Sequence, residues 1–176
     1  MRCVQRYQLH MALRGFFVRG AMTLGPICLT DEIVFGSSLI ESYVLESKTS
    51  IVPRVILTDS LQELLARALT STAADVADAI CRDIDGWWFV NYLQGARGPG
   101  GVDWELIERH KTSVMESLTK TTEHDVLPKF GWSCRYHNVF CHWHRHDPGF
   151  HDRFRIDRVD EQSTIHLLSD VVGQAG

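Results

Sequence analysis

The chain has 176 residues, which suffices for one domain with a sizeable core but leaves little for a second. Hydrophobic residues make up 44% and charged residues 23%, the balance of an ordinary globular protein. The net charge is −4 and the basic residues are scattered, which predicts no nucleic-acid partner. No apolar run approaches the roughly 20 residues of a membrane span, so no membrane helix is predicted.

The first part of the chain combines helical and strand periodicity. Its patterns predict a helix over 1–13, a strand over 16–24, short strands over 27–30 and 33–35, and a helix from Ser37 to about Ser47. Gly25 and Pro26 form a turn signal between the first two strands. The buried face of the second helix is expected to consist of its apolar residues, Leu39, Ile40, Tyr43 and Val44.

The second part begins with a β-rich run and then becomes mainly helical. Its patterns predict a strand over 54–57, helices over 60–68 and 73–83, a strand over 87–93, a glycine-rich loop over 95–101, and helices over 103–122 and 130–146. Ser60 and Glu63 match a capping box, and Asp103 is a candidate N-cap. The glycine-rich loop matches neither of the phosphate-binding motifs G-x-G-x-x-G and G-x-x-x-x-G-K-[ST], so it is interpreted as a connector.

This order of elements predicts a mixed α/β fold with hairpin-connected strands. Residues 1–146 are expected to form one domain, and the charged, irregular residues 147–176 a C-terminal tail that is partly disordered. The five cysteines are widely spaced and contain no CxxC pair, which favours reduced thiols. The N-terminus also lacks the apolar core of a signal peptide, so a cytoplasmic location is expected.

Four segments resemble the class III nucleotide cyclase domain. They are LRGFFVRGAMTLG (13–25), IVFGSSLIESYVLES (33–47) with PRVIL (53–57), DIDGWWFVNYL (83–93) with HK (110–111), and KFGWSCRYHN (129–138). The first two are typical of class III cyclases broadly. The last two resemble the compact, stand-alone bacterial cyclases of the Pycsar antiphage systems, which make cyclic pyrimidine nucleotides.

The resemblance implies a ferredoxin-like antiparallel sheet with packed helices, lacking the first strands. It also implies a homodimer that uses a nucleoside triphosphate and a divalent cation, Mg²⁺ or Mn²⁺. In the family, two aspartates on early strands hold the metals, and both precede the segment that begins here at Leu13. The resemblance therefore transfers no catalytic residue and no metal ligand, and the chain is expected to be N-terminally incomplete. Asp31 and Glu32, at the tip of a later hairpin, do not replace them.

The family also places the nucleotide of one protomer against the helix after the Phe-Gly step of its partner. The nucleotide-binding residues that the resemblance implies are Arg19, Phe35, Gly36, Ile40 and Tyr43. Ile40 and Val44 stand where many class III cyclases have Asn and Arg, and neither can donate a hydrogen bond, which argues against an ordinary adenylate or guanylate cyclase.

Three of these residues have structural alternatives. Tyr43 offers an aromatic face and a hydroxyl to a ligand, but a tyrosine on an apolar helix face also suits a core or a dimer interface. Arg19 offers a cation for a triphosphate, but it can also pair with an acidic neighbour. Gly36 can simply permit a tight strand-to-helix turn.

A histidine cluster, CHWHRHD, ends the last predicted helix. His142, His144 and His146 are of a type that binds zinc, yet the paired spacings of structural zinc sites are absent. The favoured interpretation is a solvated helix end, with zinc binding as the alternative.

Two functions follow from the resemblance. The first is a nucleotide cyclase that converts a nucleoside triphosphate, UTP or CTP, into a 3′,5′-cyclic nucleotide and pyrophosphate as an antiviral signal. The alternative is a catalytically inactive, truncated cyclase-like module for dimerisation or binding, which the lack of metal-binding aspartates favours.

Overall fold

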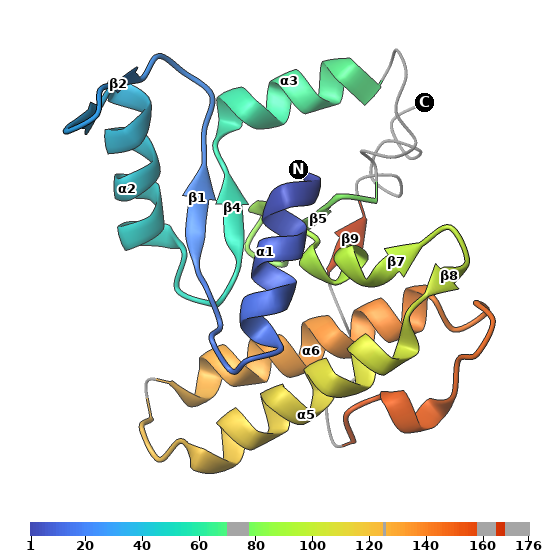
Figure 1. Ribbon diagram of the computed structural model, residues 1–176. Coiled ribbons are helices and arrows are strands. Elements are labelled where there is room, and N and C mark those ends of the chain that lie inside the picture. Colours follow the sequence, from blue (N-terminus) through green and yellow to red (C-terminus); the bar gives the residue numbers. More distant parts are fainter. Residues whose placement is uncertain (70–77, 125, 158–164, 168–176) are drawn as a thin grey trace. The chain divides into compact units, whose positions relative to one another are not determined.

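The computed structural model describes residues 1–69, 78–124, 126–157 and 165–167 (Figure 1). Within these residues the chain forms five α-helices, one five-stranded sheet and two two-stranded hairpins. It divides into two compact units. The first contains residues 1–18 and the stretch from Asn91 to Ile165, and the second contains residues 19–90 and the strand that begins at His166. The predicted mixed α+β class is confirmed.

The first unit is mainly helical. Its elements are α1 (Arg2–Ala12), the 3₁₀ helix η1 (Tyr92–Ala96), the strands β7 (Arg97–Gly98) and β8 (Gly101–Val102), α5 (Trp104–Lys120), α6 (Leu127–Trp143) and the 3₁₀ helix η2 (Asp152–Phe154). The Asp103 carboxylate accepts hydrogen bonds from the backbone N–H groups of Glu105 and Leu106, which confirms the predicted N-cap of α5.

Helix α5 packs along α6, and α1 packs on η1. A buried cluster of Val114, Cys134 and Ile156 lies between α5, α6 and the segment after η2. On the other side, Gln5 Nε2 of α1 donates a 2.9 Å hydrogen bond to the carbonyl oxygen of Asn91, just before η1. The first unit is therefore held together by a buried hydrogen bond between α1 and the start of η1 as well as by apolar packing.

The second unit contains the sheet. Its elements are β1 (Gly20–Met22), β2 (Cys28–Leu29), β3 (Val34–Phe35), α2 (Ser37–Thr49), β4 (Val55–Leu57), α3 (Asp59–Leu69), β5 (Ile80–Arg82), β6 (Trp88–Val90) and β9 (His166–Leu167). The sheet has the order β1-β4-β6-β5-β9, and β2 pairs with β3 in a separate hairpin.

All three residues of β4 are buried, and Ile56 pairs with the fully buried Phe89 of β6. The pairs β4–β6, β5–β6 and β5–β9 are antiparallel, as the predicted antiparallel sheet requires. The β1–β4 pair is parallel, because the intervening helix α2 returns the chain to the starting end of the sheet. The sheet is therefore mixed, and the prediction of an antiparallel sheet is wrong for the β1–β4 pair.

The structure differs from the prediction at two strands of the sheet, β5 and β6. The helix expected over 73–83 is a strand at Ile80–Arg82, and residues 73–77 lie outside the described residues. Ile80 and Cys81 are buried in β5, which pairs with both β6 and β9, so sheet pairing overrides the helical pattern. The strand expected over 87–93 also ends early, at Val90, and the chain continues into η1.

Candidate functional site

Helix α2 turns its polar side toward its own unit. It packs on β1, and its buried or half-buried residues recur at helical spacing and are mostly polar: Ser38, Ser42, Leu45, Glu46 and Thr49. Ser38 Oγ donates a 2.7 Å hydrogen bond to the carbonyl oxygen of Pro26, and Thr23 Oγ1 after β1 donates one of 2.7 Å to Glu41. The contacts that hold α2 in place are therefore largely polar.

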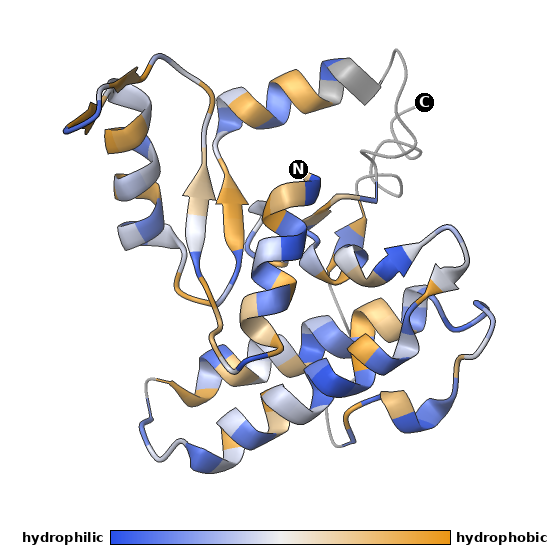
Figure 2. Cartoon of the chain, in the orientation of Figure 1, coloured by the Kyte–Doolittle hydropathy of each residue, from blue (hydrophilic) through white to orange (hydrophobic). Residues whose placement is uncertain are grey.

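The apolar residues of α2 and of the preceding hairpin are exposed instead. Nine large side chains, each between 39% and 73% exposed, form what we call the outer apolar face: Ile27, Leu29, Ile33, Val34, Phe35, Leu39, Ile40, Tyr43 and Val44. The hairpin strands stand out as hydrophobic in Figure 2. The predicted buried face of α2 is thus wrong, because polar residues of the helix bind the segment that follows β1 and the apolar side is left exposed.

Four of the five predicted nucleotide-binding residues lie on or beside this face. Phe35, Ile40 and Tyr43 are 58%, 65% and 69% exposed. Gly36 is the N-cap of α2, and a Cβ atom there would lie 2.5 Å from the carbonyl oxygen of Pro26 and 3.0 Å from Cα of Ile27. The close approach of two backbone segments therefore requires glycine at this strand-to-helix turn.

Arg19 is placed apart from these four. Its Nε lies 2.6 Å from Glu46 Oε1 on α2, and its Nη1 donates to the carbonyl oxygen of Ser50 at 3.4 Å. The side chain is 47% exposed. Arg19 therefore ties the start of β1 to the C-terminal half of α2, which is the structural alternative considered for it.

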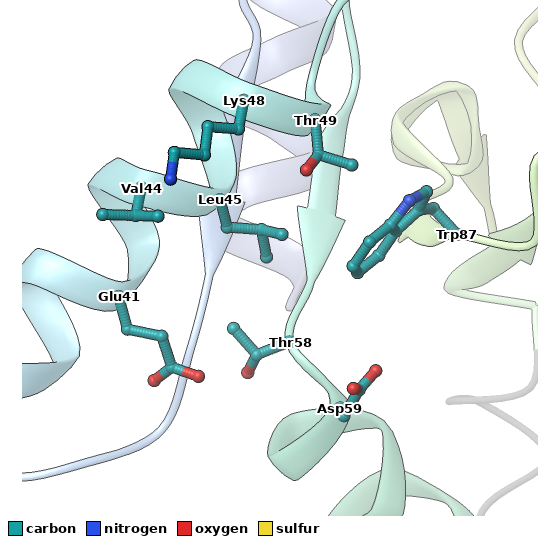
Figure 3. A pocket seen from close by; sticks show the side chains of 8 residues that line it. All are labelled: Glu41, Val44, Leu45, Lys48, Thr49, Thr58, Asp59 and Trp87. Atoms are coloured by element: carbon teal, nitrogen blue, oxygen red, sulfur yellow. The ribbon is translucent and has the colours of Figure 1, made fainter.

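A pocket lies beside α2 (Figure 3), and Val44 of the outer apolar face also lines it. It has a volume of about 360 Å³ and is formed by α2, the β4–α3 junction and the turn before β6. Its walls contain the charged side chains of Glu41, Lys48 and Asp59, and the indole ring of Trp87. None of these four was singled out as a site residue, because their sequence neighbours match no binding motif. Their proximity arises only from the sheet topology.

A buried guanidinium positions the turn that carries Trp87. The Arg54 side chain is 2% exposed and forms ion pairs with both Asp83 and Asp85. Asp85 Oδ1 also accepts a 3.2 Å hydrogen bond from the backbone N–H of Trp87. Gly86 within this turn has φ = +86°, a conformation that favours glycine. Arg54 thus holds the β5–β6 turn in place through its ion pairs with Asp83 and Asp85.

The described residues do not fit the divalent cation that the resemblance implies. Among them, no group of three or more His, Cys, Asp or Glu side chains converges on a possible ion position. Asp83 and Asp85, which lie two residues apart, both bind Arg54. Asp31 and Glu32 are exposed at the tip of the β2–β3 hairpin.

Among the described residues, the histidine cluster likewise forms no group of three side chains that could hold a zinc ion. Helix α6 ends at Trp143, so only His142 lies within it. Arg145 Nη1 donates a 2.9 Å hydrogen bond to His142 Nε2, and His144 Nδ1 lies 3.2 Å from Asp147 Oδ2. Each of these two imidazoles therefore binds a separate neighbour.

The segments that resemble the bacterial subgroup meet in a buried polar network of the first unit. Tyr92 Oη lies 2.9 Å from His110 Nε2, and His110 Nδ1 lies 3.0 Å from His137 Nδ1. His137 Nε2 lies 2.8 Å from the carbonyl oxygen of Phe154. These three side chains are at most 2% exposed. A histidine pair so buried supports the fold rather than a ligand.

The hydrogen-bond partners determine which ring nitrogen of each histidine carries the proton. A carbonyl oxygen only accepts, so His137 donates from Nε2 and, when neutral, accepts at Nδ1. His110 then donates from Nδ1 and accepts at Nε2 from the Tyr92 hydroxyl. Burial lowers the pKa of His137 to about 4 and lowers the pKa of His110 well below its ordinary value. Both imidazoles are neutral at pH 7.

The comparisons with known proteins place the chain in no family. No family model matches it, and no curated protein or solved structure matches it. None of the described helices is long and apolar enough to cross a membrane.

Proposed function

We propose that the chain is a self-associating, nucleotide-cyclase-like protein. In this proposal two copies meet through the outer apolar face, and α2 of one copy forms a wall of the nucleotide site of the other. The substrate is a nucleoside triphosphate, UTP or CTP, and the cyclic product serves as an antiviral signal.

The outer apolar face is the observation that carries the proposal. Half-exposed aliphatic and aromatic side chains present on the order of 100 Å² each, so the nine residues together offer roughly 900 Å². This total area is close to the share of each partner in a standard interface. Exposed carboxylates lie at the hairpin tip, at Asp31 and Glu32, where they can remain in solvent.

A second copy is the occupant that we favour. The same helix and hairpin carry Phe35, Gly36, Ile40 and Tyr43, which the cyclase resemblance assigns to contact with the partner's nucleotide. The location of exposed apolar side chains on these elements is what a dimeric site requires, since an apolar helix face with no partner costs free energy in water.

The proposed reaction is an intramolecular phosphoryl transfer. The 3′-hydroxyl oxygen forms a bond to the α-phosphorus, and the bond from that phosphorus to the bridging oxygen of the β-phosphate breaks. Pyrophosphate leaves with the electron pair, and the hydroxyl proton passes to solvent. Tyr43, which is 69% exposed, would stack on the base across the interface.

The second candidate function is a catalytically inactive module for dimerisation or binding. The engagement of Asp83 and Asp85 by Arg54 favours it, because these carboxylates are then not available to a metal. The outer apolar face supports this candidate equally well, so self-association alone does not separate the two functions.

Incubation of the purified chain with each of the four nucleoside triphosphates and Mn²⁺ separates them. The cyclase proposal predicts a cyclic pyrimidine nucleotide and an equal amount of pyrophosphate from UTP or CTP, measured by mass spectrometry. Tyr43→Ala should lower the yield by about tenfold or more. Tyr7→Ala is the matched control, since Tyr7 is 56% exposed on α1, and it should not change the yield. No cyclic product from any triphosphate would contradict the proposed reaction and leave the inactive module.

A further inference from the structure

The pocket beside α2 has a division of charge that points to a ligand. Figure 3 shows Glu41, Thr58 and Asp59 at one end, with Lys48 and Thr49 at the other. Glu41 accepts one hydrogen bond, from Thr23, and as a carboxylate it can accept more. Within the described residues, Lys48 and Asp59 make no ion pair and no side-chain hydrogen bond. The acidic end therefore offers two carboxylates to a donor.

The hydroxyl groups at the acidic end are already ordered. Thr58 is 4% exposed, and its Oγ1 lies 3.3 Å from Thr23 Oγ1 and 3.1 Å from Ser60 Oγ. With the bond from Thr23 to Glu41, these contacts form a continuous chain from α2 to the start of α3. This end of the pocket is thus pre-organised, which reduces the entropy that a ligand would lose on binding.

The middle of the pocket is apolar and includes one aromatic ring. Leu45 of α2 points toward Trp87 across the cavity, and Val44 also lines the pocket (Figure 3). Trp87 is held by the β5–β6 turn, whose Asp85 accepts the Trp87 backbone N–H and binds Arg54. The indole ring is therefore attached to a fixed support. Its face can contact an aromatic or aliphatic body and can attract a cation.

We propose that this pocket binds a primary organic amine with an apolar body. The ammonium group would donate to Glu41 and Asp59, and the apolar body would lie between Leu45 and Trp87. The volume of about 360 Å³ is within the range of small-molecule sites. A nucleoside triphosphate does not suit this pocket, since its many negative charges would meet two carboxylates and one ammonium. The site is therefore distinct from the nucleotide site proposed above.

An NMR titration of the ¹⁵N-labelled chain with phenethylamine tests the proposal. The Trp87 indole N–H signal, assigned with the Trp87→Phe variant, should shift with a Kd at or below about 1 mM. Two probes of similar shape serve as comparisons. Neutral 2-phenylethanol and anionic 3-phenylpropanoate should each bind at least about tenfold more weakly, because the acidic end accepts hydrogen bonds from a cation.

Substitutions at the two ends of the pocket should act in opposite directions. Glu41→Gln and Asp59→Asn should each weaken amine binding about two- to fivefold, and the double variant about tenfold. Lys48→Gln should tighten it about two- to fivefold, since the repulsion between two cations is removed. Glu63→Gln is the control, because Glu63 lies on α3 but not in the pocket, and it should have no effect.

Three results would overturn the proposal. They are the absence of any shift of the Trp87 signal at 10-fold excess over the expected Kd, tighter binding of the carboxylate than of the amine, and equal binding by the double variant and the wild-type chain. Because nucleotide turnover is not measured, failure here would leave the proposed function unaffected. Failure of the cyclase assay would likewise leave the amine site unaffected.

Discussion

Replacement of Arg54 by methionine should lower the free energy of unfolding by about 3–5 kcal/mol. The guanidinium is 2% exposed and forms ion pairs with Asp83, which is 5% exposed, and with Asp85. Its removal would leave the Asp83 carboxylate in the interior without a cation, and an uncompensated buried charge is strongly destabilising. Urea unfolding followed by circular dichroism measures the effect.

Two further variants separate the cause of this loss. Arg67→Met is the matched control, because the Arg67 side chain is 82% exposed, and it should cost no more than about 0.5 kcal/mol. Addition of Asp83→Asn to Arg54→Met should recover about 1–2 kcal/mol, since the buried negative charge is then gone. A loss below about 1 kcal/mol in Arg54→Met would mean that the buried ion pairs do not support the β5–β6 turn.

The first unit should lose stability steeply as the pH falls below about 6.5, the ordinary pKa of histidine. Burial lowers the pKa of both His110 and His137, so the unfolded chain takes up two protons that the folded chain excludes. Each group then contributes a slope of about 1.4 kcal/mol per pH unit. Between pH 6.5 and 5 the two groups together should remove about 3 kcal/mol, because the slope reaches its full value only below the unfolded pKa, and the effect of His137 should level off near its folded pKa of about 4.

The charges around the pair do not reverse this sign. Besides each other, the two imidazoles face the Tyr92 hydroxyl and the Cys141 thiol, whose pKa values burial raises, so neither neighbour is an anion at pH 5 to 7. Lys111 acts on His137 and lowers its pKa further. The nearest cation thus adds to the effect of burial.

Urea unfolding at several pH values between 5 and 7 measures this slope. His10→Gln is the control, because His10 is exposed on α1, and this variant should keep the wild-type slope. NMR titration gives an independent check, since the ring signals of His110 and His137 should stay constant between pH 8 and 5. A midpoint near 6.5 for either ring would contradict the neutral network.

The sequence pattern predicts most of the local structure. Helices α1, α2, α3 and α5 lie close to their expected ranges, because their apolar spacing and the Asp103 cap are local signals. The local pattern predicts a helix at Ile80–Arg82. The strand that forms there pairs with β6 and β9, and the pairing with β9 involves residues far along the chain that a local pattern does not include. The domain boundary at residue 146 and the cyclase-like identity stay predictions.

The orientation of α2 could not be predicted from periodicity. A single apolar stripe on a helix indicates which side avoids water, but not whether the same chain or another copy covers it. Here Glu41 and Ser38 of the polar stripe bind Thr23 and Pro26, in the segment after β1, and the apolar stripe remains exposed. The pocket was missed for a related reason, since Lys48, Asp59 and Trp87 come together only through the parallel pairing of β1 with β4 and the β5–β6 turn.

Sedimentation equilibrium tests the central claim, that a second copy covers the outer apolar face. The wild-type chain should form a dimer with a Kd in the micromolar range or below. Ile40→Asp should weaken the dimer by about a hundredfold or more, because a carboxylate would be buried in the interface. Ile84→Asp should leave the dimer intact, since Ile84 is 73% exposed in the β5–β6 turn and is not one of the nine residues of that face. A wild-type chain that stays monomeric at about 100 μM, or an equal loss in both variants, would contradict the account.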